Sequence, residues 1–325
     1  MYDCHQLCLI AVTCCSSCAT QRILARAFAE ARRDLKEHGE QNKPRFISKN
    51  HGPTLTLEEV FNASVRVIGN NSRWGSTEKM VLPNGRVSVL KRFRIVTMGK
   101  LEFGRRVERL AQVCNNSDYL VPITGYSYSK RIKYVVRDYY PMGSLADLLS
   151  GGRGGLTALT WTQRLTIIVS IARAISFIHA QSPPTDVQTN MKMNVHGNIK
   201  SSNVMINVDL TARLSDYGFI QLVDHCVGDS DHRDRAGTSN CRNLNQESDI
   251  FSFGLVMVDL LGVADSESII QGETMLFEFD AHGTDRKQAL MVLDIALSCT
   301  DLLPEARPPI SQILLFLNRV LETST

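Results

Sequence analysis

The sequence predicts an α+β fold in which a small, strand-rich half precedes a larger helical half. Two observations carry this prediction: apolar runs of strand length recur up to about residue 140, and long segments of helical periodicity follow Gly143. The chain has 325 residues, of which 43% are hydrophobic and 21% are charged. That composition is typical of a folded protein and excludes a fibrous or wholly disordered one.

The first half is expected to hold five strands and one helix. Residues 83–85, Pro-Asn-Gly, form a turn signal between two apolar runs and predict a hairpin there. In the helical segment, Phe103, Val107 and Leu110 recur at spacings of four and three and therefore share one buried face. The expected strands are residues 65–69, 79–82, 87–93, 120–128 and 134–139, and the expected helix is 100–113.

The second half is expected to be helical over residues 161–180, 249–261, 286–300 and 309–321. Together the two halves would make one folded domain from residue 54 to residue 325, divided at about residue 140 into 54–140 and 141–325. Residues 37–53 are polar and contain prolines, so they are expected to be a linker.

The N-terminal segment carries five of the nine cysteines within residues 1–20. Its apolar run, residues 7–12, is far shorter than the roughly 20 residues of a membrane span. Residues 21–36 predict a basic amphipathic helix, which makes 21–53 a helix and linker. Two interpretations stay open: S-acylation at Cys14, Cys15 and Cys18 with anchoring at a membrane surface, or a terminus without a role.

Charge and cysteine usage narrow the class of protein. The net charge is only +3, and no basic stripe interleaved with aromatic residues is present, so no nucleic-acid partner is expected. The four later cysteines are scattered singly, at positions 114, 226, 241 and 299. This spacing favours free thiols in a reducing, cytoplasmic compartment over a disulfide framework.

Five short motifs occur in a fixed order, and with them the chain resembles the eukaryotic protein kinases, most closely the plant leucine-rich-repeat receptor-like kinases. The resemblance covers about residues 60–323 and implies a bilobal fold, with a strand-rich N-lobe that carries one helix and a helical C-lobe. The motifs are Tyr140-Pro141-Met142-Gly143-Ser144-Leu145, His196-Gly197-Asn198-Ile199-Lys200-Ser201-Ser202-Asn203, Ser215-Asp216-Tyr217-Gly218, Ser248-Asp249-Ile250-Phe251-Ser252-Phe253-Gly254 and Arg307-Pro308.

The resemblance places a degenerate nucleotide site in the strand-rich half. The phosphate-covering loop would run from Gly69 to Gly75, but Asn71 stands at its middle glycine position and the loop is one residue longer than the family's. Lys91 matches the lysine that contacts the nucleotide phosphates. Val89 replaces the alanine that usually lies over the adenine, and its two extra methyl groups should narrow the slot.

Two arginines are expected to obstruct this site further. Helical phase puts Arg106, four residues before Leu110, where the family has the glutamate that pairs with the lysine, so that Arg106 would face Lys91. Glu108 would then be a solvated surface carboxylate. Arg137 takes the gatekeeper position, and we expect it to pair with Asp216 or Glu102, because a buried, unpaired guanidinium is costly.

The catalytic loop departs most from the family. Its aspartate would accept the substrate proton, but Asn198 stands in that position, and an amide has no useful basicity at neutral pH. Lys200 and Asn203 match the family, as does Asp216, the residue expected to bind Mg²⁺ together with Asn203. Weak binding of ATP and Mg²⁺ therefore stays open.

The remaining motif residues are expected to be structural. Asp249 would brace the catalytic loop, and His196 would pack and hydrogen-bond rather than act as a base. Residues 235–237, Arg-Ala-Gly, stand where the family has Ala-Pro-Glu, so Arg307 lacks its usual glutamate and needs another partner.

The sequence therefore predicts a pseudokinase, not an enzyme, that acts as a scaffold or allosteric regulator of active receptor-like kinases at the inner face of the plasma membrane. Two alternatives stay open: a slow, atypical Ser/Thr kinase that uses Lys91, Lys200, Asn203 and Asp216, and an ATP-sensing adaptor without turnover.

Overall fold

The computed structural model describes residues 45–47, 63–71, 75–129, 133–154, 158–223, 244–262, 277 and 279–323. These residues belong to two compact units. The first contains residues 45–112 and 122–139 together with 222–223. The second contains 113–121 and 140–221 and continues from residue 244 to the end. The chain passes from strands to helices at Tyr139 and Tyr140, close to the expected division.

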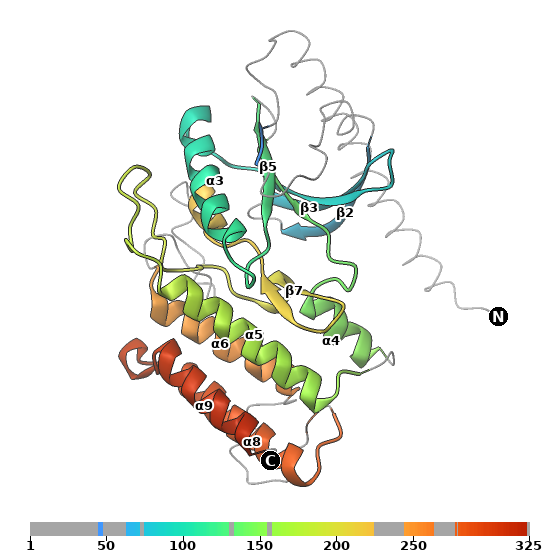
Figure 1. Ribbon diagram of the computed structural model, residues 1–325, viewed down its shortest axis with the longest axis vertical. Helices are drawn as coiled ribbons and strands as arrows, with labels where there is room; N and C mark the ends of the chain where they lie inside the picture. The colour runs from blue at the N-terminus through green and yellow to red at the C-terminus, as the bar shows by residue number, and fades with distance from the viewer. Residues whose placement is uncertain are drawn as a thin grey trace, which may run out of the picture. The chain divides into compact units, whose positions relative to one another are not determined.

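A six-stranded antiparallel sheet forms the first unit (Figure 1). Its order is β1-β5-β6-β4-β3-β2, so the strands that follow one another in the chain mostly lie side by side. The strands are β1 (Arg45–Phe46), β2 (Ser64–Asn71), β3 (Gly75–Val81), β4 (Val87–Phe93), β5 (Ile123–Tyr128) and β6 (Lys133–Asp138).

Each face of this sheet is covered by a different set of apolar side chains. On one face, Met80, Leu82, Leu90, Tyr134 and Val136 make a buried cluster. On the opposite face lies helix α3 (Lys100–Asn115), whose Phe103 ring packs against Phe93, Tyr126 and Tyr128. Phe103, Val107 and Leu110 are all fully buried, which confirms the expected phase of the helix.

The hairpin expected at residues 83–85 is present between β3 and β4. Leu82 N donates to Arg86 O at 2.8 Å, and Gly85 adopts φ +81°, a conformation that glycine reaches without strain. Strand β1 was not expected, because it lies within the segment interpreted as a linker. Arg45 and Phe46 pair with Tyr126 and Gly125 at the edge of the sheet, so the strand-rich unit includes residues before position 54.

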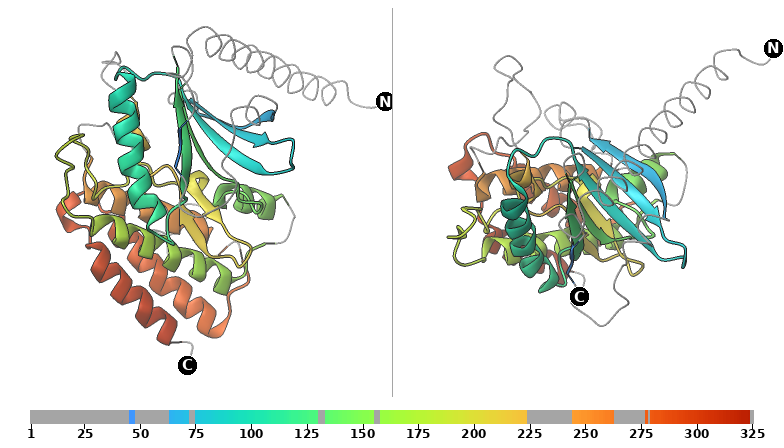
Figure 2. Two further views of the ribbon diagram at one scale, coloured as in Figure 1. Left: turned by 45° about the horizontal axis from the view of Figure 1, so that its top comes forward. Right: turned by 90° about the horizontal axis from the view of Figure 1, so that it is seen from above.

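Stacked helices form most of the second unit (Figure 2). α5 lies between apolar neighbours and buries eleven residues of its 19, which explains why its sequence is apolar on nearly all sides. The expected helices are confirmed with small shifts at their ends, and α4 and the β7–β8 hairpin are additions. The elements are α4 (Leu145–Arg153), α5 (Trp161–His179), β7 (Val204–Ile206), β8 (Ala212–Leu214), α6 (Gln246–Leu261), α8 (Gly283–Cys299) and α9 (Ile310–Glu322).

Side-chain hydrogen bonds set the beginnings of three helices. Ser144 with Asp147 and Thr160 with Gln163 form capping boxes at α4 and α5. Asn245 caps α6 by accepting from Ser248 N at 2.8 Å. The helix therefore begins at Gln246, three residues before the expected start at Asp249. Asp249 consequently lies in the first turn of α6 with its side chain turned inward, 1% exposed.

Candidate functional site

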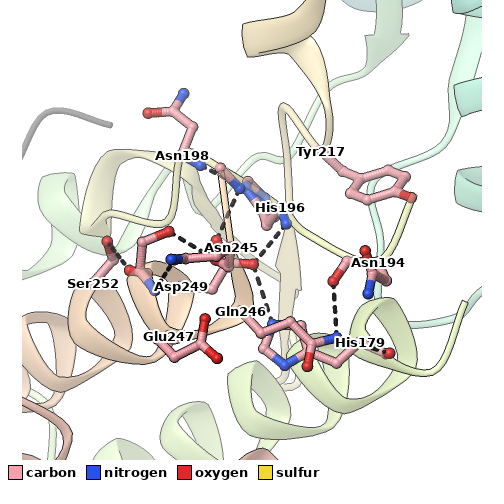
Figure 3. Close-up of polar contacts among 12 residues, drawn as sticks. His179, Asn194, His196, Asn198, Tyr217, Asn245, Gln246, Glu247, Asp249 and Ser252 are labelled. Atoms are coloured by element: carbon pink, nitrogen blue, oxygen red, sulfur yellow. Dashed lines mark hydrogen bonds and ion pairs between the residues drawn. The ribbon is translucent and has the colours of Figure 1, made fainter. Parts of the chain in front are cut away.

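The turn at His196–Asn198 is held by one carboxylate. Asp249 accepts from His196 N at 2.7 Å through Oδ2 and from Gly197 N at 2.8 Å through Oδ1 (Figure 3). Gly197 adopts φ +79°, and a Cβ there would lie 2.6 Å from the side chain of Leu244. The expected bracing role of Asp249 is therefore seen directly, and the turn requires glycine at position 197.

His196 is a structural residue in this arrangement, as expected. Its Nδ1 accepts from Asn198 N at 3.1 Å, so the proton lies on Nε2, which donates to Ser215 O at 3.1 Å. The ring packs edge-on against Tyr217 with 6.2 Å between centroids. Burial lowers the pKa of His196, although the nearby Asp249 and Asp216 carboxylates oppose the shift. The neutral ring is thus a fixed part of the core.

This burial predicts a loss of stability in mild acid. An unfolded histidine has a pKa of about 6.5. Because folding lowers the pKa of His196, the unfolded state takes up the proton first as the pH falls. The contribution of His196 is therefore complete above about pH 6.5 and is lost below it. We expect the free energy of unfolding in urea to decrease from pH 6.5 to pH 5.5, by at most about 1.4 kcal/mol for this residue.

The His196→Asn variant separates this effect from the titration of carboxylates. It should have a flatter dependence of unfolding free energy on pH over the same interval, whatever its absolute stability. An unchanged slope would show that His196 is not the group responsible.

His179, the last residue of α5, contacts the carboxylate that holds this turn, and the sequence analysis missed it. Its Nε2 lies 3.2 Å from Asp249 Oδ2, and its side chain is 6% exposed. Gln246 Nε2 lies 3.1 Å from His179 O and 3.2 Å from Asn194 O, and so joins the end of α5 to the segment before the turn. The only signal in the sequence is that His179 ends a long apolar helix, which is too weak to identify a partner 70 residues away.

The candidate catalytic residues follow this turn. Asn203 Nδ2 donates to Asn198 O at 2.8 Å, and Asn203 O accepts from Ser215 N at 2.8 Å. Asn198 Nδ2 has no hydrogen-bond partner in the described part of the chain. Its side chain can offer an amide but no carboxylate to a substrate hydroxyl.

Lys200 and Asp216 lie in the same unit. Lys200 is half-buried immediately before the short helix Ser201–Asn203, which Ser201 fastens to Asp259 through a 2.6 Å hydrogen bond. Asp216 is 4% exposed and adopts φ +65°, at the turn after β8. Within the described residues, no group of three or more His, Cys, Asp and Glu side chains is arranged to hold a metal ion.

The strand-rich unit brings Lys91, Val89 and Arg137 to one face of the sheet. Val89 lies directly opposite Arg137 in the β4–β6 register, and Lys91 is two residues further along β4. Lys91 Nζ donates to Thr77 Oγ1 at 3.3 Å, and Lys91 and Arg137 are 5% and 6% exposed. Two cationic side chains are thus buried on this face, and obstruction of a nucleotide site there by Val89 and Arg137 stays a prediction.

Arg106, which is expected to face Lys91, has an acidic partner on its own helix. Arg106 Nε donates to Glu102 Oε1 at 2.7 Å, one turn back on α3. Glu102 thus has Arg106 as a partner, and its expected pairing with Arg137 stays a prediction. Glu102 and Arg106 are four residues apart, so they lie on the same side of α3 and form an ion pair within the helix. The alternative pairing of Arg137 with Asp216 stays a prediction.

Glu108 is likewise more than the solvated carboxylate that was expected. It accepts from Tyr126 OH at 2.6 Å and from Arg45 Nη1 at 3.3 Å. These bonds tie α3 to β5 and β1, and burial together with Glu108 raises the pKa of Tyr126. The expectation failed because Arg45 had been assigned to a linker.

One of the two glycines of the phosphate-loop candidate has a structural explanation. A Cβ on Gly75 would lie 1.7 Å from Arg92 O, and the residue adopts φ +142°, so the pairing of β3 with β4 itself requires glycine. A Cβ on Gly69 would only touch Thr77 at an ordinary 3.6 Å. The structure therefore requires glycine at position 75 but not at position 69, and the degenerate nucleotide site stays a prediction.

Arg307 has found other partners, as expected. Its Nε donates to Asp301 O at 2.9 Å and its Nη1 donates to Glu247 O at 3.0 Å. The guanidinium also lies 4.8 Å from the centroid of the Phe251 ring. Residues 235–237, like Cys14, Cys15, Cys18 and the helix expected at 21–36, lie outside the described residues.

Comparison with known proteins gives the family. A family model described as protein tyrosine and serine/threonine kinase matches residues 86–317. The chain belongs to this protein kinase family. The kinase domain has an antiparallel N-lobe, which is the strand-rich unit, and a helical C-lobe. Its fold is similar to that of the pseudokinase domain of BIR2, described as an immune regulator of the RLK/Pelle family, with a TM-score of 0.69 and 22% identity over 90% of this chain and 94% of that one.

Several curated relatives are receptor kinases of Arabidopsis thaliana. The chain is 31% identical over 287 residues to the probable inactive receptor kinase RLK902, covering 79% of this chain and 42% of that protein. It is 30% identical over 305 residues to the probable inactive receptor kinase At1g48480, covering 85% and 44%. The chain thus spans less than half the length of these relatives. Among its described helices, none is long and apolar enough to cross a membrane.

Proposed function

We propose that this kinase domain is a pseudokinase that acts as a scaffold or allosteric regulator in receptor-like kinase signalling, at the inner face of the plasma membrane. The observation that carries the proposal is the catalytic loop. Asp249 holds the turn at His196 and Gly197 in place, while Asn198 supplies no basic group there. A catalytic loop that keeps its shape without its general base suits a domain whose function is to bind partners rather than to transfer phosphate.

The loss of the base predicts a large reduction in rate. General-base catalysis contributes typically 10²- to 10⁴-fold, and restoring a carboxylate at one position would not remove Arg137 from the face that carries Lys91 and Val89. We therefore expect no phosphorylated product from the chain with Mg²⁺ and radiolabelled ATP, and none from the Asn198→Asp variant.

The same assay tests the slow-kinase alternative, which the presence of Lys91, Lys200, Asn203 and Asp216 keeps open. A Mg²⁺-dependent product that rises with Asn198→Asp and disappears with Asp216→Ala would contradict the proposal and support slow transfer.

Thermal unfolding separates the scaffold from an ATP-sensing adaptor. Ligand at about 100 times its dissociation constant adds about 2.7 kcal/mol to folding stability. We expect no shift of the unfolding midpoint with millimolar ATP in Mg²⁺ or in chelator. A metal-dependent shift without phosphorylated product would support the adaptor. For the scaffold, capture of an active receptor-like kinase should be the same for the native chain and for Lys91→Met.

A further inference from the structure

The net charge of +3 conceals a strong separation of charge along the chain. Residues 45–140 carry 17 Lys and Arg against 7 Asp and Glu, a net charge of +10, whereas residues 141–325 carry 13 against 21, a net charge of −8. The total charge, which predicts no nucleic-acid partner, does not reveal this separation. An asymmetry of this size between two halves indicates that one half meets an anionic partner.

Part of the positive charge gathers at the start of α3, on the strand-rich unit. The α3 surface, as we call it, consists of Arg45, Arg94, Ile95, Lys100, Leu101 and Arg105. Leu101 is 76% exposed and Ile95 is 50% exposed. Arg94 and Arg105 are exposed, and the Arg45 side chain is 69% exposed. Within this short stretch of chain, exposed cations therefore alternate with two protruding aliphatic side chains.

Helical geometry makes this a continuous surface. Leu101, Arg105 and Glu108 recur at spacings of four and three, so they lie in one stripe along the outer side of α3. Glu108 binds Arg45 of β1, which therefore lies beside the same stripe. Burial and the positive charge of Arg45 lower the pKa of Lys100, which reflects cations held close together. An anionic partner would relieve this repulsion.

We propose that the α3 surface lies on an anionic lipid membrane, with Leu101 and Ile95 inserted between the headgroups and the surrounding cations on the lipid charges. Basic residues beside exposed aliphatic ones are typical of proteins that bind at a bilayer surface. Nucleic acid is a poorer fit, because base stacking uses aromatic side chains and the nearby Phe93 and Phe103 are buried. The acidic residues 141–325 carry the opposite charge and would not bind such a membrane.

This surface is separate from the N-terminal cysteines, so it can be tested on the full chain produced without acylation. The probe is sedimentation with vesicles of phosphatidylcholine alone or with 30% phosphatidylserine. We expect binding only to the phosphatidylserine vesicles, and weaker binding at higher salt. The Arg94→Glu/Arg105→Glu variant should bind about 100-fold more weakly, and Leu101→Asn several-fold more weakly.

The matched control reverses two exposed cations of the other unit, Arg173→Glu and Lys287→Glu. It changes the net charge equally and should bind like the native chain. Thermal midpoints of all variants should agree, which shows that they are folded. Equal binding by the native and the Arg94→Glu/Arg105→Glu chains would overturn the proposal, as would an equal loss in the control. Tight capture of polyglutamate or of a short RNA with no vesicle binding would assign the surface to that partner instead.

Discussion

Replacing Asp249 by alanine should reduce the free energy of unfolding by about 3–5 kcal/mol, a large part of the stability of a typical domain. The carboxylate is 1% exposed and accepts from two backbone amides, at 2.7 and 2.8 Å. Alanine would leave both N–H groups buried without acceptors, and each such group costs about 1–3 kcal/mol. The nearby His179 ring would also lose its partner at 3.2 Å.

Two further variants make this prediction specific. Asp249→Asn keeps the size of the side chain but has only one oxygen acceptor, so it should lie between the native chain and Asp249→Ala. Asp294 of α8 is exposed, and Asp294→Ala should change the unfolding free energy by less than about 0.5 kcal/mol. Urea denaturation measures all three. Similar stabilities for Asp249→Ala and Asp294→Ala would mean that the carboxylate does not hold the turn.

Replacing Gly254 by alanine should also destabilise the chain, by about 2 kcal/mol, although alanine normally favours a helix by about 1 kcal/mol over glycine. Gly254 lies in α6 where the helix packs against the end of α8. A Cβ there would lie 2.7 Å from Thr300 Cγ2, 2.9 Å from Cys299 Cβ and 3.0 Å from Ala296 O. The contacts with Thr300 Cγ2 and Cys299 Cβ require a shift of neighbouring atoms, and the contact with Ala296 O is also tight.

Gly152 of α4 is the control, because its Cβ would meet only Ala158 at an ordinary 3.6 Å. Gly152→Ala should leave stability level or raise it by up to about 1 kcal/mol. The opposite signs of two identical substitutions, measured by urea denaturation, identify helix packing as the cause. A gain in stability for Gly254→Ala would show that the α6–α8 contact is looser than the distances indicate.

Periodicity predicted the long elements because each buries a single face or is buried throughout. The face of α3 that carries Phe103 and Val107 is an example, and the hairpin at Gly85 follows from local turn chemistry. Strand β1 could not be predicted, since two residues carry no period and their pairing with β5, some 80 residues away, depends on the assembled sheet. The start of α6 was placed late because its cap, Asn245, precedes the apolar pattern.

The role of Asp249 was predictable, because its motif resembles the family's and the carboxylate binds backbone amides rather than other side chains. The site was not predictable where side chains choose among several partners. Helical phase indicates on which face of α3 Arg106 lies, but its ion pair with Glu102 depends on local geometry that periodicity does not contain. Glu108 depended in turn on Arg45, which no motif marks.

The hydrogen bonds of Arg307 have a consequence for how the chain can vary. Its guanidinium donates to two backbone carbonyls, those of Asp301 and Glu247, and lies against the Phe251 ring. A carbonyl acceptor is present whatever side chain occupies its position, so substitutions at 301 and 247 leave the contact available. The anchoring of Arg307 therefore makes no demand on the side chains at positions 301 and 247, and both can diversify while Arg307 stays connected to the start of α6.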